Sequence, residues 1–328
     1  MDTVARAAGV SRATVSRVIN GLPGVRSQVR DSVEEAISLL GYVPNQAARS
    51  LVTRRSGSVA LVISEPESEV FSDPFFATIV RGVGDELAEL DLDLVLMMAR
   101  HAGRHDRIVR YAHNGHVDGV LLLAMHGDDP LPGLLHSAGI PVVLGGRPVN
   151  LSDEWTFVDI DNVGGARLAV EHLLRRGCRR IATIAGPQDM GSGRARLGGY
   201  RTAIEAAGTQ AEIIEYGDFS QAGGERAMRR LLETHPDVDA VFAASDRMAL
   251  GAMTALKAAG RRIPGDVAVV GFDDSEASRF SEPPLTSVHQ STDEMSRRMV
   301  RLLQARMDGD QARTSVILPT HLVARSSS

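Results

Sequence analysis

The sequence predicts an α/β core of two doubly wound parallel-sheet lobes, preceded by an all-α headpiece that contains a helix-turn-helix. From Ser58 onward, short apolar runs alternate with amphipathic segments, which is typical of parallel strands buried on both faces. The alternation occurs in two successive series, and this indicates two lobes. Residues 1–44 show only helical periodicity, and 328 residues exceed the size of one small domain.

The headpiece is predicted to hold three helices, over about 3–8, 11–19 and 28–40. Gly9 can adopt the backbone conformation of a tight turn, and Ser11 is well placed to cap the second helix. We expect Ser27 to cap the third helix and Gly41 to follow its end. One stripe of the second helix would pack against the other two helices through Val15, Val18 and Ile19.

The opposite face of the second helix is polar. In a helix-turn-helix, the N-terminal residues of the second helix reach base edges in the major groove of DNA. Arg12 could form two hydrogen bonds to a guanine, and Ala13 could touch a thymine methyl group. The other candidate DNA-binding residues of this region are Ser11, Thr14, Ser16, Arg17 and Asn20. An ordinary three-helix bundle with a solvated polar face is the alternative.

The distribution of charge favours a polyanionic partner for the headpiece. Residues 1–56 contain eight arginines and four acidic residues, a net charge of +4, whereas the whole chain carries −5. A basic headpiece on an acidic core fits a headpiece that binds double-stranded DNA. Chance segregation of charge along the chain would give the same pattern.

A linker, about 45–57, is expected between the headpiece and the core, because Gly57 and the serines beside it indicate a flexible boundary. The core strands are predicted at about 58–63, 92–98, 119–124, 141–145, 180–185, 212–216, 239–244 and 267–272. The core helices are predicted near 75–90, 104–113, 131–138, 162–176, 193–207, 220–234 and 246–259. A final helix near 291–308 and a strand at 315–319 could return the chain to the first lobe.

Cysteine content and hydropathy predict a cytoplasmic protein without a membrane partner. Cys178 is the single cysteine, so an internal disulfide is excluded and a reducing compartment is favoured. The first 25 residues lack the apolar run of a secretory signal, and no segment approaches the roughly 20 apolar residues of a membrane span.

The motifs of common catalytic sites are missing, which predicts that the protein is not an enzyme. G-x-G-x-x-G, G-x-x-x-x-G-K-[ST], G-x-S-x-G and H-E-x-x-H do not occur. Two histidine pairs, His101 with His105 and His113 with His116, lack an acidic or cysteine partner in pattern, so we expect solvent-facing side chains and no metal site.

Longer motifs show a family resemblance. "VARAAGVSRATVSRVING" followed by "GYVPNQAARSLVTRRSG" resembles the headpiece and hinge of the lactose-repressor (LacI) family. The resemblance continues through "DPFFATIVRGV", "VDIDNVGGARLAVEHLLRRGCRRIATIAGP", "GSGRARLGGYRTAI", "AASDRMALGAM", "VAVVGFDD" and "PPLTSVHQS", and so covers essentially the whole chain. It implies a headpiece at 1–44, a hinge helix or linker at 45–57, and a core at 58–328 similar to periplasmic sugar-binding proteins. We expect one lobe at about 58–158 and 290–319, and the other at about 159–289.

In the headpiece, the resemblance places the base-reading pair on Arg12 and Ala13, with Arg17 also in the groove. The hinge leucine that wedges into the minor groove falls on Leu51, and the same hinge helix includes Asn45, Gln46 and Ala48. An apolar wedge makes physical sense, because unstacking one base step bends the duplex toward more contacts with the protein.

In the core, the resemblance implies a ligand cleft between the lobes. The corresponding positions are Asp73, Phe75, Phe76, Ser192, Arg196, Phe219, Ser245, Asp246, Asp273 and Gln290. Aromatic faces beside Asp, Arg and Gln suit a sugar, whose C–H face stacks while its hydroxyls form hydrogen bonds. Core packing is the alternative for each phenylalanine, and a helix N-cap is the alternative for Asp246.

The sequence departs from the family pattern at three places. An acidic residue that several relatives place after the "PVVL" strand is replaced by Gly146 and Arg147. The third helix begins with Val25-Arg26 instead of Val-Ser, which leaves Arg26 available for a phosphate. The chain begins at Met1-Asp2, so either Asp2 or Thr3 caps the first helix or the natural start lies upstream.

We therefore predict a homodimeric, sequence-specific transcriptional regulator, a repressor that reads a palindromic operator. Its operator affinity would be controlled by a small sugar or related metabolite bound between the lobes, with no other cofactor. A solute-binding protein or an enzyme on the same scaffold is the alternative from another class, and a DNA-binding protein with a vestigial cleft is the third. The headpiece argues against a solute-binding protein, which has no use for Arg12 or Leu51.

Overall fold

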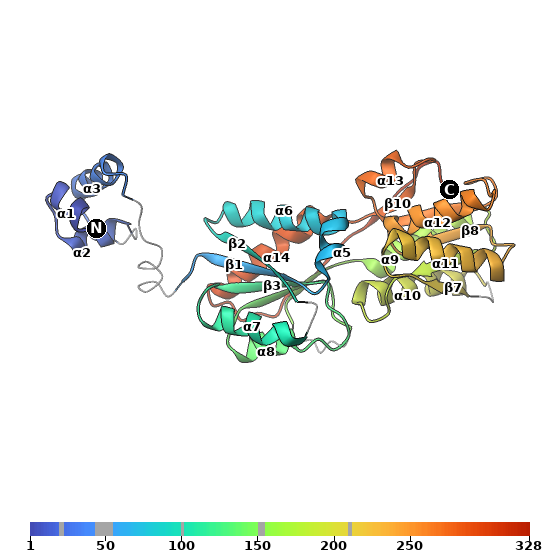
Figure 1. The fold of residues 1–328 in the computed structure, drawn as a ribbon, viewed down its shortest axis with the longest axis horizontal. Helices are drawn as coiled ribbons and strands as arrows, with labels where there is room; N and C mark the ends of the chain where they lie inside the picture. Colours follow the sequence, from blue (N-terminus) through green and yellow to red (C-terminus); the bar gives the residue numbers. More distant parts are fainter. Residues whose placement is uncertain (20–22, 43–54, 100–101, 150–154, 209–211) are drawn as a thin grey trace.

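The computed structural model describes residues 1–19, 23–42, 55–99, 102–149, 155–208 and 212–328. It contains a headpiece and two α/β lobes, which follow one another along the long axis of the molecule (Figure 1). We call them the headpiece, the N lobe, which follows the headpiece, and the C lobe at the far end.

The headpiece consists of α1 (Asp2–Ala7), α2 (Arg12–Ile19) and α3 (Ser27–Leu39). Its small core includes Val4, Val15, Val18 and Val33, and Ile19 packs against them half-buried. The apolar stripe predicted for the second helix is therefore confirmed. Gly9 has φ +66°, as the predicted turn requires.

The capping predictions have mixed outcomes. The Ser11 hydroxyl accepts a hydrogen bond from the Thr14 backbone N–H at 3.1 Å, and Gly41 follows α3 with φ +55°, so both of these are confirmed. The prediction for Ser27 is wrong, because Arg26 occupies the N-cap position and Ser27 is already helical. Asp2 and Thr3 do not cap α1 either, because that helix begins at Asp2 with Met1 as its N-cap residue.

The N lobe is built on a parallel six-stranded sheet of order β11-β5-β4-β3-β1-β2. Its strands are β1 (Ser58–Ile63), β2 (Asp93–Met98), β3 (Gly119–Leu123), β4 (Val142–Gly145), β5 (Phe157–Ile160) and β11 (Ser315–Leu318). Its helices are α5 (Glu67–Ser72), α6 (Pro74–Ala88), α7 (Ala102–His113), α8 (Leu131–Ser137) and α14 (Thr292–Met307). Leu61 and Ile63 pack in one core with Ile79 of α6, whereas Val62 packs on the other side with Ile108 of α7. The helices thus cover both faces of the sheet.

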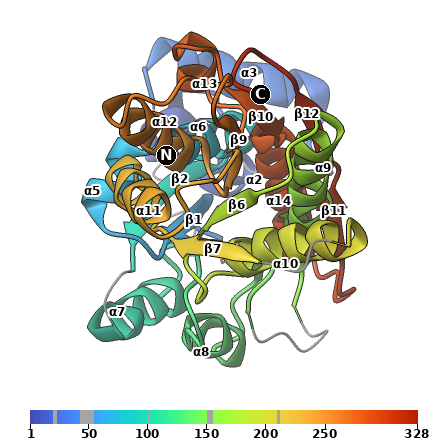
Figure 2. The same ribbon diagram turned by 90° about the vertical axis from the view of Figure 1, so that its right-hand side faces the viewer.

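The C lobe repeats this architecture with the strand order β12-β10-β9-β8-β6-β7. Its strands are β6 (Ile181–Ala185), β7 (Ile213–Tyr216), β8 (Ala240–Ala243), β9 (Ala268–Asp273), β10 (Thr286–His289) and β12 (His321–Val323). Its helices are α9 (Asn162–Arg175), α10 (Gly191–Ala206), α11 (Gln221–Thr234), α12 (Asp246–Ala258) and α13 (Glu276–Phe280). Figure 2 looks along the molecule onto this lobe and shows its helices around the strands.

The chain crosses between the lobes at β5 to α9, at β10 to α14 and at β11 to β12. The predicted return through the last helix and β11 is therefore confirmed. The end of the chain then goes back to the C lobe, because β12 pairs antiparallel with β10 and Ser327 bonds to the backbone of Val269 and Thr286. None of the described helices is both long enough and apolar enough to span a membrane.

Candidate functional site

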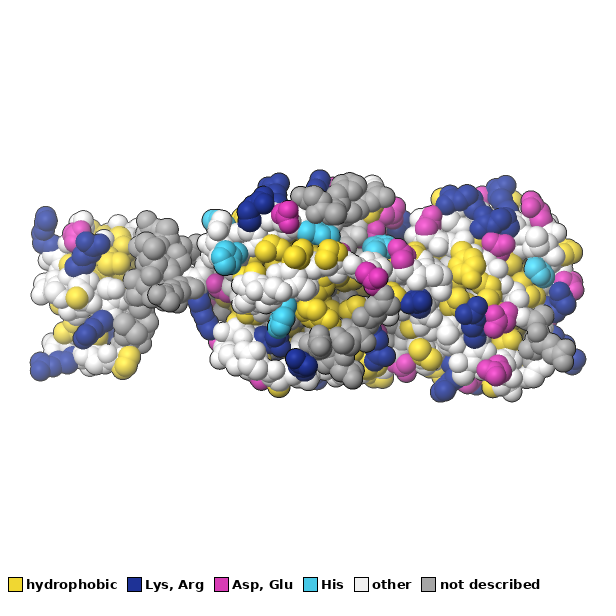
Figure 3. Space-filling view, turned by 90° about the horizontal axis from the view of Figure 1, so that it is seen from below, with side chains coloured by type: hydrophobic (Ala, Val, Ile, Leu, Met, Phe, Trp, Pro, Cys, Tyr) yellow, Lys and Arg dark blue, Asp and Glu magenta, His cyan; other side chains and the backbone are white. Residues whose placement is uncertain are grey.

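The predicted DNA-binding face of the headpiece is accessible. Ser11, Arg12, Ala13 and Arg17 are exposed, and Thr14 and Ser16 are half-buried. The Arg12 side chain is 70% exposed, and its Nε lies 3.9 Å from an Asp2 carboxylate that is equally exposed. The face seen in Figure 3 carries several basic side chains on the headpiece. Asn20, Asn45, Gln46, Ala48 and Leu51 fall outside the described residues.

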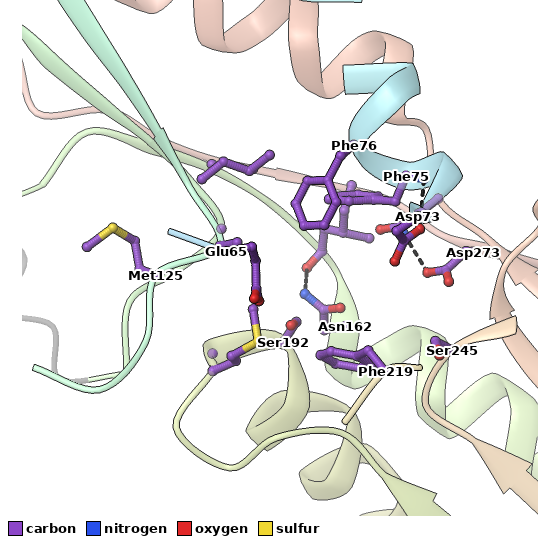
Figure 4. Close-up of a pocket in the computed structure, with 18 of the residues that line it drawn as sticks. Glu65, Asp73, Phe75, Phe76, Met125, Asn162, Ser192, Phe219, Ser245 and Asp273 are labelled. Carbon is purple, nitrogen blue, oxygen red and sulfur yellow. Dashed lines mark hydrogen bonds between the residues drawn. The ribbon is translucent and has the colours of Figure 1, made fainter. Parts of the chain in front are cut away.

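A cleft lies between the two lobes and is lined by residues from both of them. It is lined by nine of the ten predicted cleft residues, namely Asp73, Phe75, Phe76, Ser192, Arg196, Phe219, Ser245, Asp273 and Gln290. In the view of Figure 4, Glu65 and Met125 lie at one end, Asp73 and Asp273 at the other, and Ser192 between them. The structure thus brings together residues that are more than 200 positions apart in the sequence.

Arg196 is a buried cation of the cleft, with 5% of its surface exposed. Its Nε donates to the Asn162 side-chain oxygen at 2.8 Å, and one terminal nitrogen donates to the Ala244 carbonyl oxygen at 2.6 Å. The guanidinium lies 3.6 Å from the centroid of the Phe272 ring. Burial lowers its pKa, and the carboxylates of Asp273, Asp159 and Asp246 oppose that shift. The side chain is held as a preorganised cation with a fixed orientation.

Asp273 is the acidic partner of Arg196 across a 3.4 Å contact. It also accepts a 2.6 Å hydrogen bond from the Gln290 side-chain amide. Burial raises the pKa of Asp273 well above its ordinary value, and Arg196 acts against this shift. The backbone of Asp273 has φ +121°, a conformation that costs energy in a residue with a side chain. This backbone conformation is found at a residue that lines the cleft.

Asp246 lies behind the cleft lining and not in it. Its side chain is fully buried and accepts hydrogen bonds from the Ser287 hydroxyl and from both the backbone N–H and the hydroxyl of Ser275. Burial raises its pKa, and these hydrogen bonds act in the opposite direction. The N-cap of α12 is Ser245, whose hydroxyl accepts from the Met248 N–H. Asp246 therefore does not line the cleft, and it is not the N-cap residue of α12. Its hydrogen bonds to Ser275 hold the loop after β9 in place.

The aromatic residues of the cleft differ in burial: Phe76 is buried, whereas Phe75 and Phe219 are half-buried. Phe76 is 7% exposed and belongs to the N-lobe core, while Phe75 meets its ring edge-on at 5.3 Å between centroids. Phe219 has φ +62°, and its ring packs so closely on Gly186 that a Cβ there would lie 2.3 Å from it. Phe76 therefore both packs in the core and lines the cleft. Phe219 also lines the cleft, and its backbone has a strained, positive φ.

Two charged contacts, which we call the clasps, cross from one lobe to the other at the cleft. In the first, Arg247 at the start of α12 donates to Glu69 at 3.1 Å and to Asp73 at 3.2 Å. In the second, His126 lies 2.9 Å from Glu65 of its own lobe and 2.9 Å from Asp189 of the C lobe. The two carboxylates raise the pKa of His126 to about 9, so the ring is cationic at neutral pH. The clasps hold the lobes together over the cleft.

Several lining residues were not anticipated from the sequence, including Glu65, Met125, Arg147, Asn162 and Arg247. Four of them directly follow the N-lobe strands β1, β3, β4 and β5. The carboxyl ends of parallel strands are where α/β proteins bind ligands, and this rule could have found them. Arg147 stands after the "PVVL" strand, where several relatives have an acidic residue, and its side chain lines the cleft at this place.

Among the described residues, no group of three or more potential metal ligands occurs, and His101 of the first histidine pair lies outside those residues. The expectation that these histidines face solvent is wrong for His105. Its side chain is 9% exposed, and Nε2 lies 3.6 Å from Asp129.

Comparison with known proteins assigns the family. Residues 1–45 match the family described as bacterial regulatory proteins, lacI family, and residues 170–328 match the periplasmic binding protein-like domain. The chain is 53% identical over its full length to the HTH-type transcriptional regulator CelR of Thermobifida fusca, of which the match spans 97%. The protein belongs to the LacI family. It is thus a DNA-binding transcriptional regulator, as the sequence predicts.

Further relatives agree with this assignment. The ribose operon repressor of Escherichia coli strain K12 is 36% identical over 92% of this chain and 91% of its own length. Among solved structures, the transcriptional regulator CelR–cellobiose complex superposes with a TM-score of 0.81 at 50% identity, covering 100% of this chain and 99% of the other. The lac repressor dimer bound to operator and the anti-inducer ONPF gives 0.85 at 29% identity, covering 99% and 97%.

Proposed function

We propose that this protein is a homodimeric repressor whose affinity for a palindromic operator is set by a sugar bound between the lobes. The cleft is the observation that carries the proposal. It combines the half-buried aromatic rings of Phe75 and Phe219 with fixed hydrogen-bonding groups on Arg196, Asp273 and Gln290. This pairing of stacking surface and oriented polar groups is what sugar rings require.

We propose cellobiose as the effector, because the CelR–cellobiose complex is 50% identical to this chain over its whole length. The elongated cleft supports a disaccharide, since polar groups occur at both of its ends, at Glu65 and at Asp73.

We propose a division of labour in which residues 1–44 read DNA, 45–57 form the hinge, and 58–328 bind the sugar and dimerise. Arg12, Ala13 and Arg17 would contact bases, while Leu51 would wedge into the minor groove. Dimerisation is supported by the likeness of this chain to the lac repressor dimer bound to operator. A cytoplasmic location follows from the proposed function, because the DNA that such a repressor binds lies there. The relatives named above are regulators, and this supports a protein without catalytic activity.

Lobe closure supplies the mechanism of the proposed switch. A sugar that binds the closed lobes better than open ones shifts the population toward the closed form. The clasps made by Arg247 and His126 favour closure on their own, so the sugar has only part of the free energy to supply. The two N lobes of a dimer would then present their hinges at a spacing that the sugar controls.

Selection of bound fragments from a genomic library at fixed, near-physiological salt tests this function. We expect recovery of a palindromic site, and elution of the same fragments when cellobiose shifts the affinity. Recovery of only non-specific fragments by the full chain would contradict a sequence-specific reader. Recovery of a site whose binding no sugar alters would leave DNA binding intact and refute the switch.

A further inference from the structure

The junction between the linker and the N lobe is pinned by one carboxylate. Asp118 accepts hydrogen bonds from the Ser56 N–H at 2.7 Å, the Ser56 hydroxyl at 3.0 Å and the Gly57 N–H at 2.8 Å. On the other side, the Gly57 carbonyl oxygen accepts from the Asp93 N–H at 2.8 Å. The flexible boundary that the sequence predicts at Gly57 is therefore wrong for residues 55–57, which are held between the starts of β2 and β3.

The geometry of this junction depends on a glycine. Gly57 has φ +74°, a conformation that residues with a side chain rarely adopt. With this turn, the two N–H groups of Ser56 and Gly57 converge on the Asp118 carboxylate while the chain enters β1 directly at Ser58. Charge-assisted hydrogen bonds of this kind are about twice as strong as neutral ones. The direction in which the chain leaves the sheet is thus fixed by two residues acting together.

A second contact joins the same junction to the cleft. The Arg55 guanidinium donates to the Met307 carbonyl oxygen and to the Asp308 carboxylate, both at 2.9 Å, at the C-terminal end of α14. The other end of α14 follows Gln290 of the cleft lining, and Met295 in its first turn also lines the cleft. A 16-residue helix is about 24 Å long, so one rigid element reaches from the cleft to the linker.

We propose that Asp118 is a positioning residue for regulation, which makes residues 55–57, at the end of the linker, move as one body with the N lobe. The inference rests on the proposed function, because it describes how a change at the cleft reaches the DNA-binding face. A loose joint at residues 55–57 would let the lobes rearrange without moving the headpieces. The pinned joint transmits the displacement of α14 and of the sheet into the linker.

The test compares three full-length proteins: wild type, Asp118→Asn and Asp91→Asn. In Asp118→Asn, the side-chain NH₂ faces one of the N–H donors and the charge is lost. Asp91 is exposed and lines the same surface hollow, but it accepts none of the hydrogen bonds from Ser56 and Gly57 described above, so its variant is the matched control for the change of charge. Cellobiose affinity is measured by calorimetry, and operator affinity by fluorescence anisotropy with and without cellobiose.

We expect the ratio of operator affinities with and without cellobiose to be at least about fivefold in wild type and in Asp91→Asn. In Asp118→Asn the ratio should fall to within about twofold of one, while cellobiose affinity stays within about twofold of wild type. An unchanged ratio in Asp118→Asn would overturn the proposal. A large loss of cellobiose affinity in that variant would also overturn it, since Asp118 would then act on the core and not on the joint.

Two further measurements keep the outcomes separate. Gly57→Ala strains the same joint without removing a charge, and we expect the same loss of coupling. Hydrogen exchange at the Ser56 and Gly57 amides should accelerate in Asp118→Asn and not in Asp91→Asn. If wild type shows no cellobiose effect, the proposed function is wrong; unaltered exchange in Asp118→Asn would refute the anchored joint whatever the effector does.

Discussion

The headpiece and the cleft hold their functional arginines in opposite ways. Arg12 is 70% exposed and its nearest acidic group lies 3.9 Å away. Arg196 is 5% exposed and is fixed by Asn162, the Ala244 carbonyl oxygen and the Phe272 ring. An arginine that reads a long polymer must be free to meet it, whereas one that binds a small molecule gains by being held in place beforehand.

This difference determines what a substitution can reveal. Removal of Arg12 leaves the folded protein almost unchanged, because little of its side chain packs on anything. Removal of Arg196 takes the guanidinium away from the Asp273 carboxylate and from the Ala244 carbonyl oxygen, so we expect both stability and ligand affinity to fall.

The largest effect is expected for Arg196→Met. Losing one partner of a buried charge pair costs about 3–5 kcal/mol of stability. Cellobiose affinity should fall more than about 30-fold, since truncating such a pair at a binding site costs at least about 2 kcal/mol. Calorimetry and thermal unfolding measure the two effects. Arg194→Met, an exposed change two residues away on α10, is the control, and equal effects from both variants would refute the special role of Arg196.

Arg12→Ala tests the exposed side of the contrast. A base contact with two hydrogen bonds is worth about 1–3 kcal/mol, so affinity for the preferred operator should fall about 5–150-fold, while affinity for random DNA changes little. Thermal stability should stay within about 0.5 kcal/mol of wild type. Arg26→Ala provides the comparison, because loss of a phosphate contact should weaken all sequences and reduce the salt slope by about one. Equal losses on both DNAs for Arg12→Ala would show that this helix does not read bases.

The His126 clasp predicts a dependence on pH. The pKa of His126 is raised from 6.5 to about 9 in the folded protein by Glu65 and Asp189. Its contribution to stability is therefore complete below pH 6.5 and is lost as the pH rises through 9. The melting temperature of wild type should fall between pH 7 and pH 9.5 more steeply than that of His126→Gln. Parallel curves would show that the clasp does not hold the lobes; His113→Gln, at an exposed helix end, should behave as wild type.

The smallest effect is expected for Ser11→Ala, which removes the cap of α2. Loss of an N-cap costs about 1 kcal/mol, and the cost should be confined to the headpiece. Hydrogen exchange of the α2 amides in the full chain should accelerate about fivefold, with the lobes unaffected. Ser11→Asp should restore protection, because aspartate caps equally well. Unchanged exchange in Ser11→Ala would mean that the cap does not limit opening of this helix.

The elements that the sequence predicts well are those whose own pattern determines them. Apolar runs such as β1 and β3 are buried on both faces, and a helix such as α6 carries its stripe over several turns. The strand β12 has three residues, too few to show a period, and its place depends on pairing with β10. Short elements of this kind are fixed by tertiary contacts that a local pattern does not contain.

The same limit applies to the cleft. Asp73, Arg196 and Asp273 were predicted because the family resemblance identifies each position. Arg247 was missed because its partner Asp73 lies 174 residues away in the other lobe, so no local pattern contains the pair. Asp246 was predicted to line the cleft because the family motif around it belongs to the cleft wall. Its side chain is instead buried behind the lining, where it accepts a hydrogen bond from Ser287, which is distant in the sequence.

We propose that one sugar in the cleft controls DNA binding by the headpiece, which lies outside the cleft. The decisive experiment is an anisotropy titration of the full chain with its selected operator, at one salt concentration, without cellobiose and at the lowest cellobiose concentration that saturates wild type. We predict an operator affinity that changes at least about fivefold in wild type and does not change in Arg196→Met. Cellobiose binding by wild type with an unaltered operator affinity would contradict the account.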